Sequence, residues 1–161
     1  MPKLLIALME YTSTIIIEVP IDTFIKKLDN HENMKHWQRG LVSFEHVSGD
    51  PGKIGAKMKL NYNFGKRKMT LLETITKNNL PHKLHLHYDT KGLHNIQKNY
   101  FEQTPEGYTK WVSKSEFIAT EFMMRMMTVF MPNIIKKQTM QYLLDFKNFA
   151  EKGLSVQNET T

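Results

Sequence analysis

Methionine is concentrated in one stretch of the chain, EFMMRMMTVFMPN at residues 121–133, which holds five of the eleven methionines. Thioethers are soft ligands that suit Cu(I). They are also unbranched and polarizable, so they adapt to apolar molecules of varied shape. Nothing else in the sequence points to copper handling, since the chain has no cysteine. We therefore interpret the stretch either as core packing or as the wall of a pocket for an apolar ligand, and copper binding is the least favoured interpretation.

Pro132 interrupts the same stretch. A proline lacks the backbone N–H that an internal helix position needs, so it either kinks the helix or begins a new one. Our hypothesis is that Pro132 separates a movable lid from a fixed C-terminal helix.

A second candidate site is the array His85, His87 and Asp89 in the stretch KLHLHYD. Residues two apart on a strand share a face, and two imidazoles with a carboxylate offer three ligands of the kind that zinc takes. However, the alternating residues of the stretch are apolar and should form the buried face. The array then lies in solvent, where nothing encloses a metal ion, and we predict no biological metal site.

Glu73 shares its strand register with Leu71 and Ile75, which we expect to face the interior. Burying a carboxylate charged and alone is expensive, so it must be paired or neutral. Glu73 is therefore either at a sheet edge or in a salt bridge with an arginine, or it is a candidate general acid or base with a raised pKa. The sequence contains no G-x-S-x-G, P-loop or G-x-G-x-x-G motif, and we predict no cofactor.

The elements that would position these residues follow from periodicity. Residues 11–20 are β-branched and predict a strand, and two short helices should follow up to Trp37, the first with Asp22 as its N-cap. Residues 41–120 alternate between apolar and polar positions and are divided by glycine and proline turns, which predicts six more strands in an antiparallel meander. After Thr120 the pattern is helical up to Gly153. The predicted class is α+β, with about seven strands curled around one long C-terminal helix.

On the last strand, one face carries Trp111, Ser113, Ser115 and Phe117, and we predict that this face points to the interior. Its serines would then offer hydrogen bonds to the polar end of a ligand. On the preceding strand, residues 95, 97 and 99 all carry amide side chains. These amides either add polar groups to the interior or face water.

Length and charge limit the alternatives. The 161 residues suit one domain, predicted at residues 1–153, with a polar, frayed tail at residues 154–161. The net charge is +6, but basic residues are scattered apart from the cluster at residues 66–68. We therefore expect no nucleic-acid binding, and only weak contact with an anionic membrane surface or an acidic protein partner. No apolar run approaches the ~20 residues that span a bilayer or forms a signal peptide, so we expect a soluble, cytoplasmic protein.

The order of these elements resembles the helix-grip fold of the SRPBCC superfamily, which includes START-like and polyketide cyclase-like proteins. The strand–helix opening resembles that of the family through Pro20, Phe24, Leu28, Asp29, Asn33, Met34 and Trp37. The stretch DPGKIGAKMKL, which begins at Asp50, is similar to the family's proline-glycine turn, and the resemblance covers residues 11–153. It implies a cavity between the sheet and the long helix where apolar molecules bind, but it does not imply a reaction.

We therefore expect a protein that binds a hydrophobic small molecule or lipid for carriage or sensing. One alternative is a cyclase- or dehydratase-like enzyme that uses Glu73 or a cavity tyrosine, and another is an interaction module of the chaperone-assisting type. An enzymatic role is the less favoured one. The expected cavity wall consists of Trp37, Met58, Leu60, Tyr62, Met69, Leu71, Leu86, Tyr88, Trp111, Met123, Met127 and Phe130.

Overall fold

The structure is a computed structural model that describes residues 7–159. Within these residues, seven strands form one antiparallel sheet in the order β1-β7-β6-β5-β4-β3-β2. The strands are β1 (Ala7–Ile17), β2 (Leu41–Ser48), β3 (Lys57–Asn63), β4 (Lys68–Asn79), β5 (Lys83–Thr90), β6 (Leu93–Gln103) and β7 (Thr109–Ala119). Strands β2 to β7 are consecutive neighbours, which confirms the predicted meander, and β1 closes the far edge against β7.

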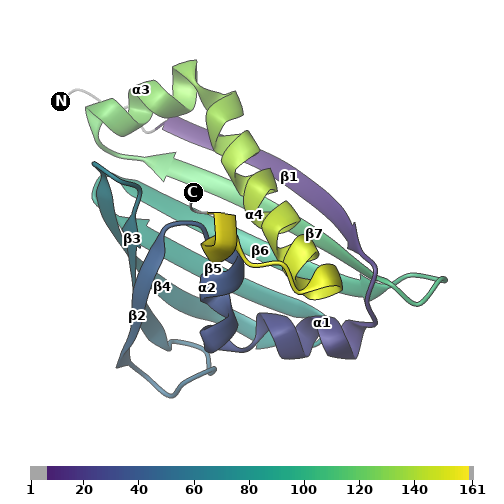
Figure 1. Ribbon diagram of the computed structural model, residues 1–161. Helices are drawn as coiled ribbons and strands as arrows, with labels where there is room; N and C mark the ends of the chain where they lie inside the picture. The colour runs from purple at the N-terminus through teal and green to yellow at the C-terminus, as the bar shows by residue number, and fades with distance from the viewer. Residues whose placement is uncertain (1–6, 160–161) are drawn as a thin grey trace.

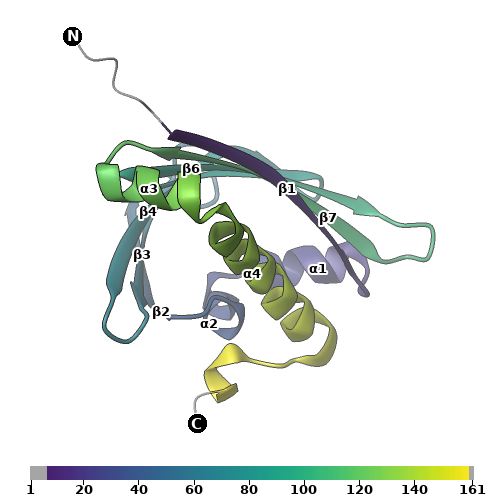
Figure 2. The same ribbon diagram turned by 90° about the horizontal axis from the view of Figure 1, so that it is seen from above.

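Four α-helices accompany the sheet in the described part of the chain. They are α1 (Ile21–Leu28), α2 (Met34–Trp37), α3 (Phe122–Phe130) and α4 (Pro132–Lys152). Two 3₁₀ turns, η1 (His31–Asn33) and η2 (Val156–Glu159), complete the elements. The long helix α4 crosses the hollow side of the sheet (Figure 1), and the sheet bends around it when seen from above (Figure 2). The α+β helix-grip architecture predicted from the sequence is therefore confirmed.

Alternation along the strands decides which side chains face α4. On β3, Met58, Leu60 and Tyr62 are buried while the residues between them are more exposed. Successive strands continue these rows across the sheet, because antiparallel pairs bring same-face residues opposite each other. One such row joins Glu73 to Tyr88. It then passes through Asn95 to Phe117.

An aromatic cluster closes the end of the sheet that α1 covers. Phe24 of α1 and Phe146 of α4 are both fully buried, and their ring centroids lie 5.2 Å apart. Trp111 packs edge-on against both of them, at 5.7 Å and 5.6 Å. Trp37 packs edge-on against Phe146 at 5.2 Å. Tilted and edge-to-face contacts of this kind add to the free energy gained from apolar burial, so they hold α1, α2 and α4 on one core.

A clasp between α4 and the segment after α2 holds the long helix in place. The Arg39 guanidinium donates to both carboxylate oxygens of Asp145, over 2.6 Å from Nε and 2.9 Å from Nη2. Gln141 donates to the same carboxylate over 2.9 Å. Asp145 is only 3% exposed, and a buried carboxylate needs partners of this kind. The same interaction raises the pKa of Arg39 above its ordinary value.

Pro132 begins a new helix rather than kinking a continuous one. Helix α3 ends at Phe130, Met131 leaves the helical region at φ −131° and ψ 43°, and Pro132 is the first residue of α4. At the other end of α4, Gly153 adopts φ 67°, a left-handed cap that glycine supplies without strain.

Two local predictions differ from the structure. Pro20, not Asp22, is the N-cap of α1, and Asp22 lies in the first helical turn. The tail predicted as frayed instead turns back onto the domain: the Ser155 hydroxyl lies 2.9 Å from Nδ1 of His36, and Glu159 pairs with Arg39 over 2.7 Å. Residues 1–6 of the predicted domain and residues 160–161 of the tail lie outside the described residues.

Candidate ligand-binding cavity

A cavity of about 390 Å³ lies between the concave face of the sheet and the helices. This volume falls in the range of small-molecule sites, roughly 300–1,000 Å³. Strands β3 to β7 form its floor, and α2, α3 and α4 cover it. Phe64 and Arg67, from the turn between β3 and β4, line the same end as Met124 and Met127 of α3. The aromatic cluster contributes Phe101 at the opposite end.

Eight of the twelve residues predicted for the wall line this cavity. They are Trp37, Tyr62, Met69, Leu71, Leu86, Tyr88, Trp111 and Met127. They come from four strands and two helices, because the alternation along each strand predicts the correct face. Their contact with a ligand stays a prediction.

The other four predicted residues lie elsewhere. Met58 and Leu60 are buried in the main core. Met123 and Phe130 are each 70% exposed, on the outer side of α3. The inner side of that helix instead presents Met124, Met127 and Thr128 to the cavity. The sequence of α3 is apolar nearly all round, so its periodicity could not decide which side faces the sheet.

Side-chain amides of β6 form a polar strip on the cavity floor. Asn95, Gln97 and Asn99 all line the cavity, so the first of the two alternatives for them is correct. Asn99 accepts from the Trp111 indole over 2.9 Å and donates to Gln97 Oε1 over 3.2 Å. The Asn95 amide nitrogen donates to the carbonyl of Glu116. These bonds occupy Oε1 of Gln97 and Nδ2 of Asn95, and they leave an amide donor and a carbonyl acceptor that can meet a ligand.

Helix α4 adds polar groups that the sequence analysis did not assign to the site. Gln138, Thr139 and Tyr142 line the cavity together with the apolar Ile135, and the hydroxyls of Tyr11 and Thr139 share a short hydrogen bond. Their spacing of three and four residues is that of one helix face. This spacing is the signal in the sequence that could have placed them there.

The interior face of β7 is the predicted one. Trp111, Ser113 and Ser115 are each at most 5% exposed, and Trp111 and Phe117 reach the cavity. Ser113 does not line it. Its hydroxyl is buried without a hydrogen-bond partner in the described part of the protein.

Glu73 does not itself line the cavity, but its carboxyl shares a hydrogen bond with Tyr88, which does. Burial raises the pKa of Glu73 to about 7, and the hydrogen bond with Tyr88 acts in the opposite direction. Burial, together with the nearby charge of Glu73, raises the pKa of Tyr88 well above its ordinary value. Tyr88 itself lines the cavity. The pair is therefore a half-buried acid whose proton can be shared with a hydroxyl that a ligand would touch.

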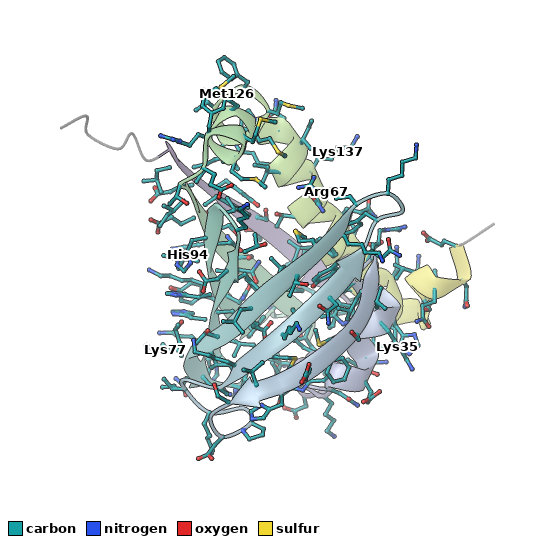
Figure 3. All side chains as sticks on the ribbon, turned by 90° about the vertical axis from the view of Figure 1, so that its left-hand side faces the viewer. Lys35, Arg67, Lys77, His94, Met126 and Lys137 are labelled. Carbon is teal, nitrogen blue, oxygen red and sulfur yellow. The ribbon has the colours of Figure 1, made fainter. Side chains whose placement is uncertain are left out.

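The histidine array lies on the convex face of the sheet, on the opposite side from buried Leu86. His94 of β6 pairs with Asp89, and its ring lies 5.1 Å from that of His87. Figure 3 shows His94 on the outer side of the sheet. Across residues 7–159, no group of three or more histidine and acidic residues is arranged to hold a metal ion.

Solved structures with the same architecture are numerous, although no protein-family model and no curated protein sequence matches the chain. An aromatase/cyclase from a Streptomyces species superposes with a TM-score of 0.74 at 10% identity, over 90% of this chain and 94% of its own. Ara h 8.0201 superposes at 0.70 with 13% identity, over 89% and 98%. An uncharacterized protein from Rhizobium leguminosarum superposes at 0.68 with 14% identity, over 92% and 99%.

These similarities define the class of fold. The protein has the helix-grip fold that these solved structures share. Membership of the SRPBCC superfamily stays a prediction from the sequence. At such low identities a shared fold does not transfer an activity, so the function has to be argued from the cavity itself.

Proposed function

We propose that the protein binds a hydrophobic small molecule or lipid in the cavity between the sheet and α4. The observation that carries the proposal is a 390 Å³ space with largely apolar walls and a strip of amides along its floor. A protein interior is normally packed to the density of an organic crystal. A space of this size is therefore more than a packing defect, and its lining matches that of ligand sites.

The lining also indicates how the ligand would be held. Leucine, methionine and aromatic side chains would take apolar ligand surface out of water, at about 25 cal/mol for each Å² before ordering costs. Asn95 and Gln97 would then orient the polar end of the ligand by one accepted and one donated hydrogen bond. The ligand we expect is amphipathic, with an apolar body and a polar group that reaches β6.

The chain provides its own reporters for a binding test. It has two tryptophans, and both Trp37 and Trp111 line the cavity. We expect protein purified without detergent to release an apolar compound on solvent extraction, detected by mass spectrometry. Adding that compound back to the stripped protein should change the tryptophan fluorescence in a saturable way.

A pair of variants on one helix separates the cavity from the surface. Met127→Arg places a charge on the cavity wall and should weaken ligand binding at least tenfold. Met123→Arg makes the same change on the exposed side of α3 and should leave binding in solution unchanged. Circular dichroism establishes that both variants fold. If neither variant alters binding, or if no compound is ever extracted or bound, the proposal is wrong.

A second function, proton transfer in the manner of a cyclase or dehydratase, is favoured by the Glu73–Tyr88 pair. A carboxyl with a pKa of about 7 gives and takes protons near neutrality, as a general acid or base must. Under this proposal Tyr88 would contact the substrate and Glu73 would supply the proton through it. Glu73→Gln should then abolish conversion of the extracted compound while leaving its binding intact. Chromatography follows the conversion together with mass spectrometry, because a cyclisation without loss of water leaves the mass unchanged. An unchanged conversion in this variant would exclude the pair.

A third function, as an interaction module of the chaperone-assisting type, would need no ligand. The accessible cavity favours ligand binding over this alternative.

A further inference from the structure

Large apolar side chains lie exposed in a row along α3 and the first turn of α4. We refer to them as the α3 surface, which consists of Phe122, Met123, Met126, Val129, Phe130, Met131 and Ile134. Phe122 is 66% exposed, and Met123 and Phe130 are each 70% exposed. Single exposed apolar residues are ordinary, but a contiguous group of this kind marks an interaction site.

The opposite side of α3 is already in use. It packs against β1 and β7, and Thr128 is buried there. A helix that is apolar on nearly its whole circumference needs partners on more than one side. The fold supplies one of them, so the α3 surface is the side that lacks its partner.

Positive charge flanks the α3 surface. Lys66, Arg67 and Lys68 lie in and beside the turn between β3 and β4, and Lys136 and Lys137 lie near the start of α4. All five are exposed, and within residues 7–159 none of them takes part in an ion pair. Figure 3 shows Met126 at the tip of the molecule, with Lys137 and Arg67 at the same end.

This end of the molecule is also one end of the cavity. Met124 and Met127 on the inner side of α3 line it, as does Arg67. The partner of the α3 surface would therefore lie directly over the helix that separates the cavity from the outside.

The combination of exposed apolar side chains with unpaired cations selects one partner over another. A second copy of this chain, docked around a two-fold axis, would set the same surface against itself. It would bring Lys136 and Lys137 of each copy near those of the other, and such like-charge contacts are costly. An anionic lipid surface instead accepts both features, because its interface buries apolar side chains and its headgroups attract lysine and arginine.

We propose that α3 is a membrane-docking helix that lies in the plane of an anionic bilayer. The α3 surface would enter the boundary between headgroups and acyl chains, and the five flanking cations would bind headgroup phosphates. The nine residues of α3 extend for about 13 Å, and no helix in the described part of the chain is long and apolar enough to cross a bilayer. Docking would place the α3 end of the cavity on the membrane, where a ligand could enter or leave. This last step rests on the proposed function, but docking itself does not.

The test uses the full-length protein with vesicles made of phosphatidylcholine alone or of equal parts phosphatidylcholine and phosphatidylglycerol. In flotation, the protein should bind the anionic vesicles, and high salt should weaken that binding. The double variant Phe122→Asp/Phe130→Asp should lose at least about tenfold in affinity, since burying one such side chain is worth about a factor of ten or more. Lys136→Glu/Lys137→Glu should also lose binding to anionic vesicles.

A matched control carries the same change on a different face. Val47→Asp/Ile54→Asp replaces two apolar residues that are 52% and 68% exposed, at the end of β2 away from the β3–β4 turn, and it should bind vesicles like the wild type. If wild-type protein stays unbound with both vesicle types, membrane docking is refuted. It is also refuted if Phe122→Asp/Phe130→Asp binds vesicles as well as the control variant does. A wild-type dimer that Phe122→Asp/Phe130→Asp converts to a monomer would refute it in favour of a second copy.

The same proteins separate this proposal from the proposed function. Phe122→Asp/Phe130→Asp should lose vesicle binding but keep ligand binding in solution, because neither phenylalanine lines the cavity. Met127→Arg should show the reverse. Loss of ligand binding in every form, with vesicle binding intact, would overturn the ligand proposal and leave docking in place.

Discussion

Glu73→Gln is expected to stabilise the protein above neutral pH. Burial raises the pKa of Glu73 from its ordinary value of 4.5 to about 7. A carboxyl with a higher pKa in the folded state than in the unfolded state binds its proton more tightly when folded, so ionisation opposes folding. The stability that the protonated carboxyl allows is complete below about pH 4.5, and it is lost as the pH rises through about 7.

The size of the effect follows from the same two pKa values. One pKa unit corresponds to about 1.4 kcal/mol, so the ionised carboxyl should cost up to about 3 kcal/mol at pH values above about 8. Glutamine has the same shape without the charge, and its carbonyl can still accept a hydrogen bond from Tyr88. The variant should match the wild type near pH 4.5 and exceed it by up to about 3 kcal/mol above pH 8.

Urea unfolding at a series of pH values, followed by the fluorescence of Trp37 and Trp111, measures this difference directly. Glu45→Gln is the control, because Glu45 is exposed on β2 and its loss should not change the pH dependence. A difference between wild type and Glu73→Gln that is constant from pH 5 to pH 9, within about 0.5 kcal/mol, would show that Glu73 ionises as freely in the folded protein as in the unfolded chain.

Three further outcomes are expected. Tyr88→Phe removes the hydrogen bond that lowers the pKa of its neighbouring carboxyl, so the loss of stability in a urea titration should move to higher pH; an unmoved midpoint would contradict this bond. Arg39→Ala leaves Asp145 buried without its guanidinium and should lower the free energy of unfolding by about 2–3 kcal/mol, toward the low end because Arg39 is partly exposed; a loss below about 0.5 kcal/mol would argue against the clasp. Phe146→Ala should cost about 3–5 kcal/mol in denaturant unfolding, whereas Leu144→Ala, an exposed neighbour on the same helix, should cost less than about 1 kcal/mol.

Much of the sheet was predictable because strand alternation has a period of two and leaves only one choice of face. Once Leu86 is taken as buried, the histidines beside it must point outward, and this local rule holds for most of β3 to β7. The order of strands followed as well, since connections of a few residues allow only antiparallel neighbours. Eight of the twelve expected wall residues line the cavity for the same reason.

The helices near the cavity were less predictable. Helix α3 is apolar on almost every side, so no hydrophobic stripe tells Met127 from Met123. Its orientation depends on how Pro132 breaks the chain and on where β1 and β7 meet it. The polar floor of the cavity was equally hard to predict. A row of amides on one face of β6 is compatible with a face in water or with a polar cavity wall, and only the closure of the sheet around α4 decides between them.

The sequence by itself determined the class of fold, the register of the strands, the proline break and the inward side of β7, because each depends on neighbours within a few residues. Only the tertiary structure decided that space remains between the sheet and α4, that Glu73 meets the cavity through Tyr88, and that one side of α3 stays uncovered. These properties depend on the distance between elements far apart in the chain, and no local pattern of residue types encodes that distance.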